Sequence, residues 1–362
     1  MRRASSSPGR RALLVGLVAL PLGCSDRSPG ATGSDGLRRE VEDRVEAAGA
    51  AGFSGSVLVT VDGATLLARS YGLADREGDI ANQVDTAYDV GSVMKDLTAA
   101  AVFQLASDGM LAVTDPIATF FEEAPADKAA ITILQVIQHR AGFREYHDTE
   151  GDFEPMTRLE ARQRILAQEL LFEPGTDQAY SNAGYTLLAD VIETVSGRSF
   201  TDLVREEILA PAGMERSGFY GDPVWDEVET AIGYDASRFQ DNDPATWPYT
   251  WALVGNGGLV TTVLDLDRWF VAIRAGDVLP PAALEAYEVE YLGEGSADAA
   301  RAPRAAAGGS DFGFGGYAMD SPDEGTRVIL GTNRYDALDV DGFGDELSLL
   351  VLGLEDQVSR SE

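Results

Sequence analysis

A serine and a lysine three residues apart are the first pair in this sequence whose types and spacing could do chemistry. Ser92 and Lys95 lie in the stretch GSVMK, and the chain has only one other lysine, Lys128. If Ser92 opens a helix, Lys95 follows one turn later on the same face. A lysine that burial keeps neutral could take the serine proton, which an arginine could not do. The pair also fits an ordinary helix start followed by a surface charge.

A second candidate group is Tyr180-Ser181-Asn182, which precedes a helical pattern. A phenol held near a lysine could move protons. The amide of Asn182, both donor and acceptor, could orient the lysine and an amide of the substrate. A tyrosine before a helix is also commonly just a half-buried aromatic, so the triplet alone does not decide between the two interpretations.

Other catalytic arrangements have weaker support. His139 and His147 are the only histidines, and no Gly-x-Ser-x-Gly stretch accompanies them, which argues against a Ser-His-Asp triad. His139 is interpreted as a structural residue in a turn that ends a helix. Because there is no H-E-x-x-H and no cysteine pair, we predict no metal and no cofactor. The acidic run 336–346 fails as a calcium loop and is predicted to be a solvated surface loop.

Strand and helix patterns predict the elements that position these residues. Strand-like runs surround Asp62-Gly63, a pair that tolerates the positive φ of a tight hairpin, and two more surround the turn at 322–325. The low-complexity run 296–310 predicts a loop. Helical patterns cover 37–50, 92–109, 131–139, 157–171, 184–196, 200–209, 264–274 and 346–356.

This order predicts an α/β (α+β) fold with one antiparallel sheet built from both ends of the chain. We expect one domain over 37–356, with a sheet lobe at about 37–80 and 250–356 flanked by helices. An all-α lobe at about 81–249 is inserted between its halves. A cleft between two such lobes is a common place for a catalytic site.

The N-terminal segment predicts export. Residues 1–24 have a basic start and a short apolar run that ends at Cys24, the only cysteine. This pattern is typical of a lipoprotein signal peptide, with Cys24 as the lipidation site, and a plain secretory signal is the alternative. Residues 25–36 read as a flexible tether. We expect a lipoprotein on the periplasmic or extracellular side of a bacterial membrane.

The net charge excludes some partners. Formal net charge is −32, which argues against nucleic acid and against electrostatic binding to anionic lipid. Membrane contact is therefore expected only through a lipid anchor at Cys24. The expected partner is a small-molecule ester or amide substrate.

Five ordered stretches carry a family resemblance. They are GSVMKDLTAAAVFQLASDGMLAVTDPI, LQVIQHRAGF, FEPGTDQAYSNAGYTLLADVIETVSG, APAGMERSGF and NGGLVTTVLDLDRWF. Together they resemble the serine β-lactamase and penicillin-binding-protein superfamily, in the branch of class C β-lactamases, D-Ala-D-Ala carboxypeptidases and related esterases. The resemblance runs from about residue 53 to 354. The family's fold, a sheet lobe plus an all-α lobe, agrees with the order of elements above.

The resemblance implies a role for each matching residue. Ser92 would be the nucleophile, Lys95 its activating partner, Tyr180 a general base and acid, and Asn182 a positioning group. The oxyanion hole would use the backbone N–H of Ser92 and that of Ser310 on an edge strand.

The third family motif departs from the pattern. The motif has a basic residue followed by two small ones, and this chain aligns Ala307 with the basic position and Gly308 and Gly309 with the small ones. Without that cation, a phenol such as Tyr180 is harder to deprotonate, and a substrate carboxylate is bound less well. Arg301 or Arg304 could compensate from a nearby loop.

Three hypotheses follow. The first is an exported serine hydrolase that acts on esters through an acyl-enzyme on Ser92. The second is a β-lactamase or D-Ala-D-Ala carboxypeptidase in which Arg301 or Arg304 replaces the cation. The third is a non-catalytic relative that binds cell-wall peptides or a partner protein, motivated by Ala307.

Overall fold

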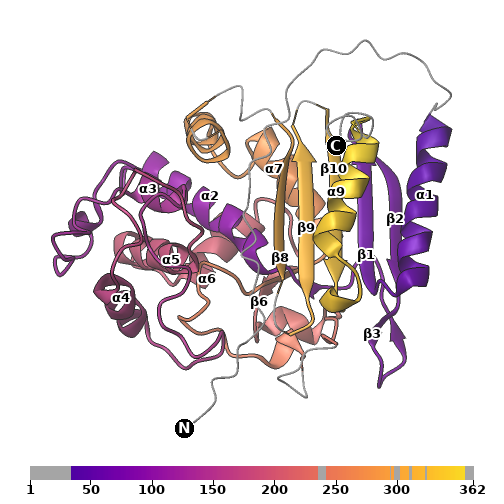
Figure 1. Cartoon of the computed structure of the whole chain (residues 1–362), viewed down its shortest axis with the longest axis horizontal. Helices are drawn as coiled ribbons and strands as arrows, with labels where there is room; N and C mark the ends of the chain where they lie inside the picture. The colour runs from indigo at the N-terminus through magenta and orange to yellow at the C-terminus, as the bar shows by residue number, and fades with distance from the viewer. Residues whose placement is uncertain are drawn as a thin grey trace, which may run out of the picture.

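A five-stranded antiparallel sheet is the centre of the structure (Figure 1). The computed structural model describes residues 34–234, 242–293, 295–296, 302–309, 312–322 and 324–354. The strand order is β2-β1-β10-β9-β8, and every neighbouring pair is antiparallel. The strands are β1 (Gly55–Val61), β2 (Ala64–Tyr71), β8 (Arg304–Gly309), β9 (Gly315–Ser321) and β10 (Thr326–Thr332).

An early and a late strand of the chain pair in the middle of this sheet, as the sequence predicts. Strand β1 pairs with β10 along its length, from Gly55 opposite Thr332 to Thr60 opposite Arg327. The predicted hairpin between β1 and β2 is confirmed, because Asp62 and Gly63 both have positive φ. The edge strand β8 lies on the side of the sheet that faces the helical lobe (Figure 1).

Helices cover both faces of the sheet. On one face α1 (Ser34–Ala51) and α9 (Val340–Val351) bury a core with alternate residues of the strands, including Val57, Val59 and Tyr317. On the other face α7 (Val263–Ala275) packs against Leu58 and Ile329. Successive strand residues point to opposite faces of the sheet. Because helices cover both faces, the side chains on both faces are apolar.

The remaining helices form the lobe that the sequence predicts between the two halves of the sheet (Figure 1). It contains α2 (Met94–Ser107), α3 (Ile133–Ile137), α4 (Arg158–Ala167), α5 (Asn182–Ser196) and α6 (Phe200–Val204), the last continued by a π turn over Arg205–Leu209. Helix α2 is almost wholly buried, since it passes through the core shared by both lobes. The lysine candidate is therefore carried on an element that is held on all sides.

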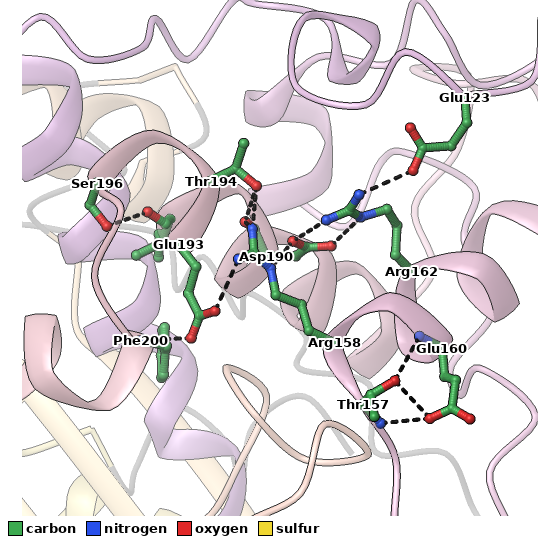
Figure 2. Close-up of polar contacts among 11 residues, drawn as sticks. Glu123, Thr157, Arg158, Glu160, Arg162, Asp190, Glu193, Thr194, Ser196 and Phe200 are labelled. Atoms are coloured by element: carbon green, nitrogen blue, oxygen red, sulfur yellow. Dashed lines mark hydrogen bonds and ion pairs between the residues drawn. The ribbon is translucent and has the colours of Figure 1, made fainter.

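Charged side chains attach α4 to α5 (Figure 2). Asp190 of α5 is buried and accepts from Arg158 Nε and from Arg162 Nε at 2.6 Å. Arg158 also pairs with Glu193 at 3.2 Å, and Arg162 with Glu123 at 3.1 Å. One buried carboxylate thus joins two arginines of a polar helix to a helix that begins at the candidate site.

Shorter elements complete the described chain. They are β3 (Leu73–Asp75), β4 (Ile80–Ala81), β5 (Tyr88–Asp89), β6 (Gly218–Phe219), β7 (Leu259–Thr261), α8 (Pro281–Ala286) and a π turn at Tyr287–Leu292. Strands β5, β7 and β6 form a small sheet next to the serine candidate. Within the described ranges, no helix has both the length and the apolar content to cross a membrane.

Several local predictions are wrong. Helix α1 begins at Ser34, inside the predicted tether 25–36, and Arg304, expected in a loop, begins strand β8. The acidic run 336–346 is not all surface loop, because α9 begins at Val340 with Asp339 as its N-cap. The apolar face of α9, which includes Phe343 and Leu347, packs on the sheet. Burial of this face stabilises the helix by more than the glycines in the run destabilise it. The run 296–310 is not all loop either, since 304–309 form strand β8.

Candidate active site

The serine candidate lies on a short turn directly before a buried helix. Ser92 is in the 3₁₀ turn Gly91–Val93, which leads into α2. Gly91 has φ +52, a conformation that glycine adopts without strain, and its N–H donates to Asp89 Oδ1 at 2.9 Å. The other oxygen of that buried carboxylate accepts from Tyr220 at 2.8 Å. The buried carboxylate of Asp89 therefore holds the turn that carries Ser92 in place.

Lys95 reaches Ser92 from one turn further along. Its Nζ donates to Ser92 Oγ at 3.0 Å and to the carbonyl oxygen of Asn256 at 2.6 Å. The side chain is only 4% exposed. Burial lowers the pKa of Lys95 to about 7, against the opposing effect of Glu145, Asp152 and Asp96. A large fraction of Lys95 is consequently neutral at neutral pH and can accept a proton.

Tyr180 meets the same serine oxygen from the helical lobe. Its hydroxyl forms a hydrogen bond with Ser92 Oγ, and Lys95 Nζ lies 4.8 Å from the centre of its ring. Burial raises the pKa of Tyr180 well above its ordinary value, and this exceeds the lowering effect of the bond to Ser92. Tyr180 is thus protonated at neutral pH, whereas Lys95 is the group poised to lose its proton.

Asn182 begins α5, two residues after Tyr180. It is buried, and its backbone N–H donates to the carbonyl oxygen of Glu145 at 2.9 Å. Lys95 is held by the carbonyl of Asn256, so the role of Asn182 in orienting the lysine stays a prediction.

Strand β8 passes directly over the serine turn. A Cβ added to Gly308 would lie 2.3 Å from the backbone nitrogen of Ser92, so only glycine fits there. Gly309 follows it at the end of the strand. The second predicted oxyanion donor, Ser310, lies outside the described residues.

The alignment of the third motif needs correction. The side chain of Ala307 packs with the α1 and α9 core, on the face of the sheet away from the helical lobe. Alternation along β8 places Ala306 on the same face as Gly308, and Ala306 packs against the core that contains α2. Position 306, not 307, therefore lies on the face of β8 that covers the Ser92 turn. It is also an alanine, so neither position supplies a cation.

Arg304 of β8 lies farther along that inner face. It lines a cavity of about 20 Å³ together with Asp96 and Ala306, and its guanidinium lies 5.2 Å from the centre of the Tyr291 ring. The pKa of Arg304 is raised, because the attraction of Tyr291 and Asp96 exceeds the effect of burial. Its charge therefore faces an internal carboxylate and phenol. Arg301, the other predicted substitute, lies outside the described residues.

Sequence reasoning missed Asn256, and it interpreted His139 as structural without identifying its bond to the segment that carries Tyr180. The contribution of Asn256 is a backbone carbonyl, which leaves no side-chain signal in the sequence. His139 lies just past α3, and its Nδ1 accepts from the N–H of Ser181 at 3.1 Å. That bond engages Nδ1 away from Ser92, so the structure brings together serine, lysine and tyrosine rather than a Ser-His-Asp triad.

Across the residues that the structure describes, no group of three or more His, Cys, Asp or Glu side chains is placed to hold a metal ion.

Comparison with known sequences gives a family match. The family model described as Beta-lactamase matches residues 37–342. The chain is 29% identical over 225 residues to a putative penicillin-binding protein, PbpX, of Bacillus subtilis, covering 62% of this chain and 56% of the relative. It is 29% identical over 227 residues to a D-aminopeptidase of Brucella anthropi, covering 60% and 42%. The chain thus spans about half the length of the curated relatives that it matches.

Solved structures share the fold. A penicillin-binding protein homologue from Pyrococcus abyssi superposes with a TM-score of 0.74 at 23% identity, covering 87% of this chain and 77% of that one. A D-amino acid amidase from Ochrobactrum anthropi gives 0.71 at 20%, covering 89% and 99%. A class C β-lactamase in complex with cefoxitin gives 0.71 at 19%, covering 88% and 99%.

Proposed function

Because this chain belongs to the Beta-lactamase family of serine hydrolases, we propose that it hydrolyses acyl substrates through an acyl-enzyme on Ser92. One observation carries the proposal. Ser92 Oγ is hydrogen-bonded both by Lys95 Nζ, at 3.0 Å, and by the Tyr180 hydroxyl. A nucleophile in contact with a base of pKa about 7 and with a phenolic donor is equipped for acyl transfer.

The protonation states of Lys95 and Tyr180 indicate which of them accepts and which donates a proton in each step. Neutral Lys95 takes the proton of Ser92 as Oγ attacks the acyl carbon, and the Ser92 N–H faces the developing oxyanion. When the tetrahedral intermediate collapses, Tyr180 donates its proton to the leaving oxygen and regains one from Lys95. Water then attacks the acyl carbon, its proton passes to the same pair, and Ser92 Oγ is reprotonated as the acid leaves.

Esters without a neighbouring carboxylate are the proposed substrates. Positions 306 and 307 are both alanine, and Arg304 faces Tyr291 and Asp96. The formal net charge of −32 adds a general repulsion of anionic substrates. These features support short neutral esters over penicillins or peptides with a C-terminal carboxylate.

Amide hydrolysis is the second candidate. It is favoured by the names of two relatives, the D-aminopeptidase of Brucella anthropi and AmpH of Escherichia coli, a D-alanyl-D-alanine-carboxypeptidase/endopeptidase. A tyrosine that is protonated at neutral pH could also donate a proton to an amine leaving group.

Labelling with a fluorophosphonate tests the proposal. The chain from residue 25 onward is treated and digested, and peptide masses are compared with those of Ser92→Ala. We expect a single adduct on Ser92 and turnover of a p-nitrophenyl acyl ester that Ser92→Ala abolishes. A folded protein without adduct or turnover would favour the non-catalytic alternative. A chromogenic cephalosporin, a D-alanyl-D-alanine peptide and a D-amino acid anilide separate the substrate classes.

Export with a lipid anchor is part of the proposal. It is supported by the signal-like segment 1–24 and by the single cysteine at its end. Expression of the full chain in a bacterium should give a membrane-bound mature protein. The substitution Cys24→Ser should leave it unacylated. Equal acylation and membrane retention in both forms would exclude Cys24 as the lipidation site.

A further inference from the structure

His139 holds the segment that carries Tyr180 from two sides. The N–H of Ala179 donates to the carbonyl oxygen of His139 at 3.0 Å, and the N–H of Ser181 donates to its Nδ1 at 3.1 Å. These two amides flank Tyr180 in the chain. The backbone on either side of the phenol is therefore bonded to one residue of another segment.

The imidazole also packs against the phenol itself. Its ring centre lies 4.8 Å from that of Tyr180 and 5.1 Å from that of Tyr185. Tyr185 is fully buried and is fixed by a bond from its hydroxyl to the carbonyl oxygen of Ile137 at 2.9 Å. The histidine is thus held between a fixed tyrosine and the one that contacts Ser92.

His139 has a backbone conformation that few residues adopt. Its φ is +58, in the left-handed region that only a few per cent of non-glycine residues adopt, among which asparagine, aspartate and histidine are over-represented. Such conformations persist where the surroundings enforce them, and they concentrate at functional sites. Burial, with a further effect of Lys95, lowers the pKa of His139 to about 3. The ring is neutral at neutral pH, and Nδ1 is an acceptor there.

We propose that His139 is a positioning residue for the reaction: its Nδ1, by accepting from the Ser181 N–H, holds the Tyr180 hydroxyl against Ser92. The inference rests on the proposed function, in which Tyr180 moves the proton. A displacement of about 1 Å at a reacting group can cost on the order of a hundredfold in rate. The effect should fall on kcat rather than on KM, because His139 acts through Tyr180.

Two substitutions separate this role from simple packing. Asparagine and glycine both tolerate a positive φ, so neither adds backbone strain. His139→Asn places an amide oxygen where Nδ1 lies and keeps an acceptor, whereas His139→Gly removes it. With a p-nitrophenyl ester we expect kcat of His139→Gly to fall about a hundredfold with KM within threefold. His139→Asn should recover at least tenfold of that loss.

A double substitution shows whether His139 acts through Tyr180. In a Tyr180→Phe background, His139→Gly should cost less than threefold in kcat, because the group that it positions is already gone. The inference is overturned by an undiminished loss in that background, by equal losses in the asparagine and glycine variants, or by wild-type kcat in the glycine variant. If the glycine variant does not fold, a folded asparagine variant more than a hundredfold slower than wild type also overturns it.

Hydrogen exchange provides a readout that does not need turnover. In the peptide that covers 176–183, the Ser181 amide should be protected in wild type and His139→Asn, and should exchange faster in His139→Gly. Equal exchange in all three overturns the positioning contact. Absence of Ser92-dependent turnover in wild type would refute the proposed function alone, and the exchange result would still decide the contact.

Discussion

The side-chain nitrogen of Lys95 lies 2.6 Å from the carbonyl oxygen of Asn256, which holds it 3.0 Å from Ser92 Oγ. Asn256 is itself fixed, since its side-chain amide donates to Thr186 at 2.8 Å and to the carbonyl oxygen of Ala252 at 3.2 Å. A neutral amine has two protons, so it can still donate to the carbonyl and keep a lone pair available for the serine proton. The carbonyl can therefore orient Lys95 without requiring that it be charged.

The pH dependence of turnover should report Lys95. Its pKa is lowered to about 7 in the folded protein, so it is protonated, and inactive as a base, below that pH. We expect kcat/KM for a neutral ester to rise tenfold per pH unit below about 7 and to level off above it. Since the pKa of Tyr180 is raised, no fall should appear on the alkaline side up to pH 9. A rising limb centred near pH 10 would mean that Lys95 is charged in the resting enzyme.

Replacement of Lys95 by arginine should keep a cation but remove the base. Arginine does not lose its proton in proteins, so Lys95→Arg should lower kcat/KM by about a thousandfold. The chain offers a matched control in Lys128, its other lysine, which is buried and paired with Asp127 at 2.6 Å. Lys128→Arg should stay within threefold of wild type when both are assayed on the same ester. Equal activity of the two variants would exclude Lys95 as the base.

A cation introduced on the inner face of β8 should change substrate preference. Ala306→Lys would extend toward the site, whereas Ala307→Lys would extend to the α9 face. We expect Ala306→Lys to raise kcat/KM for carboxylate-bearing substrates about tenfold relative to neutral esters, a gain of about 1.4 kcal/mol. Ala307→Lys should not change this ratio. The assay compares a neutral ester with an ester that carries a carboxylate, and a gain in the Ala307 variant alone would restore the alignment made from sequence.

The link between α4 and α5 should contribute to stability. Asp190→Asn leaves Arg158 and Arg162 without their shared buried carboxylate (Figure 2) and should lower the free energy of unfolding by about 3 kcal/mol. The control is Glu123→Gln, since Glu123 is 51% exposed and pairs with Arg162 at the surface. That change should cost about 0.5 kcal/mol. Urea unfolding measures both, and equal losses would show that burial of Asp190 is not what makes the difference.

Much of the fold could be predicted because its signals are local. The Asp62-Gly63 hairpin and most helices follow from turn chemistry and periodicity. Residue pattern predicted a loop where strand β8 lies, since a run of alanine and glycine has low strand propensity. It forms because small residues let its backbone approach β9 and the Ser92 turn.

The parts of the site that side chains form could be predicted from the sequence, whereas the parts that backbone atoms form could not. The spacing of Ser92 and Lys95 and the Tyr180 triplet pointed to residues that the structure brings together. The Asn256 carbonyl has no sequence signal. The difference between positions 306 and 307 depends on strand register, where a shift of one residue moves a side chain to the other face.

The pairing of β1 with β10 constrains when this protein can fold. The partners Gly55 and Thr332 are separated by most of the chain, so the β1–β2 hairpin has an unpaired inner edge until β10 has been synthesised. Contacts of such large sequence separation form slowly. An incomplete chain that ends before residue 326 exposes that edge to other chains, which favours aggregation. Completion of synthesis, rather than the appearance of the serine and lysine, is therefore the step that makes a working site possible.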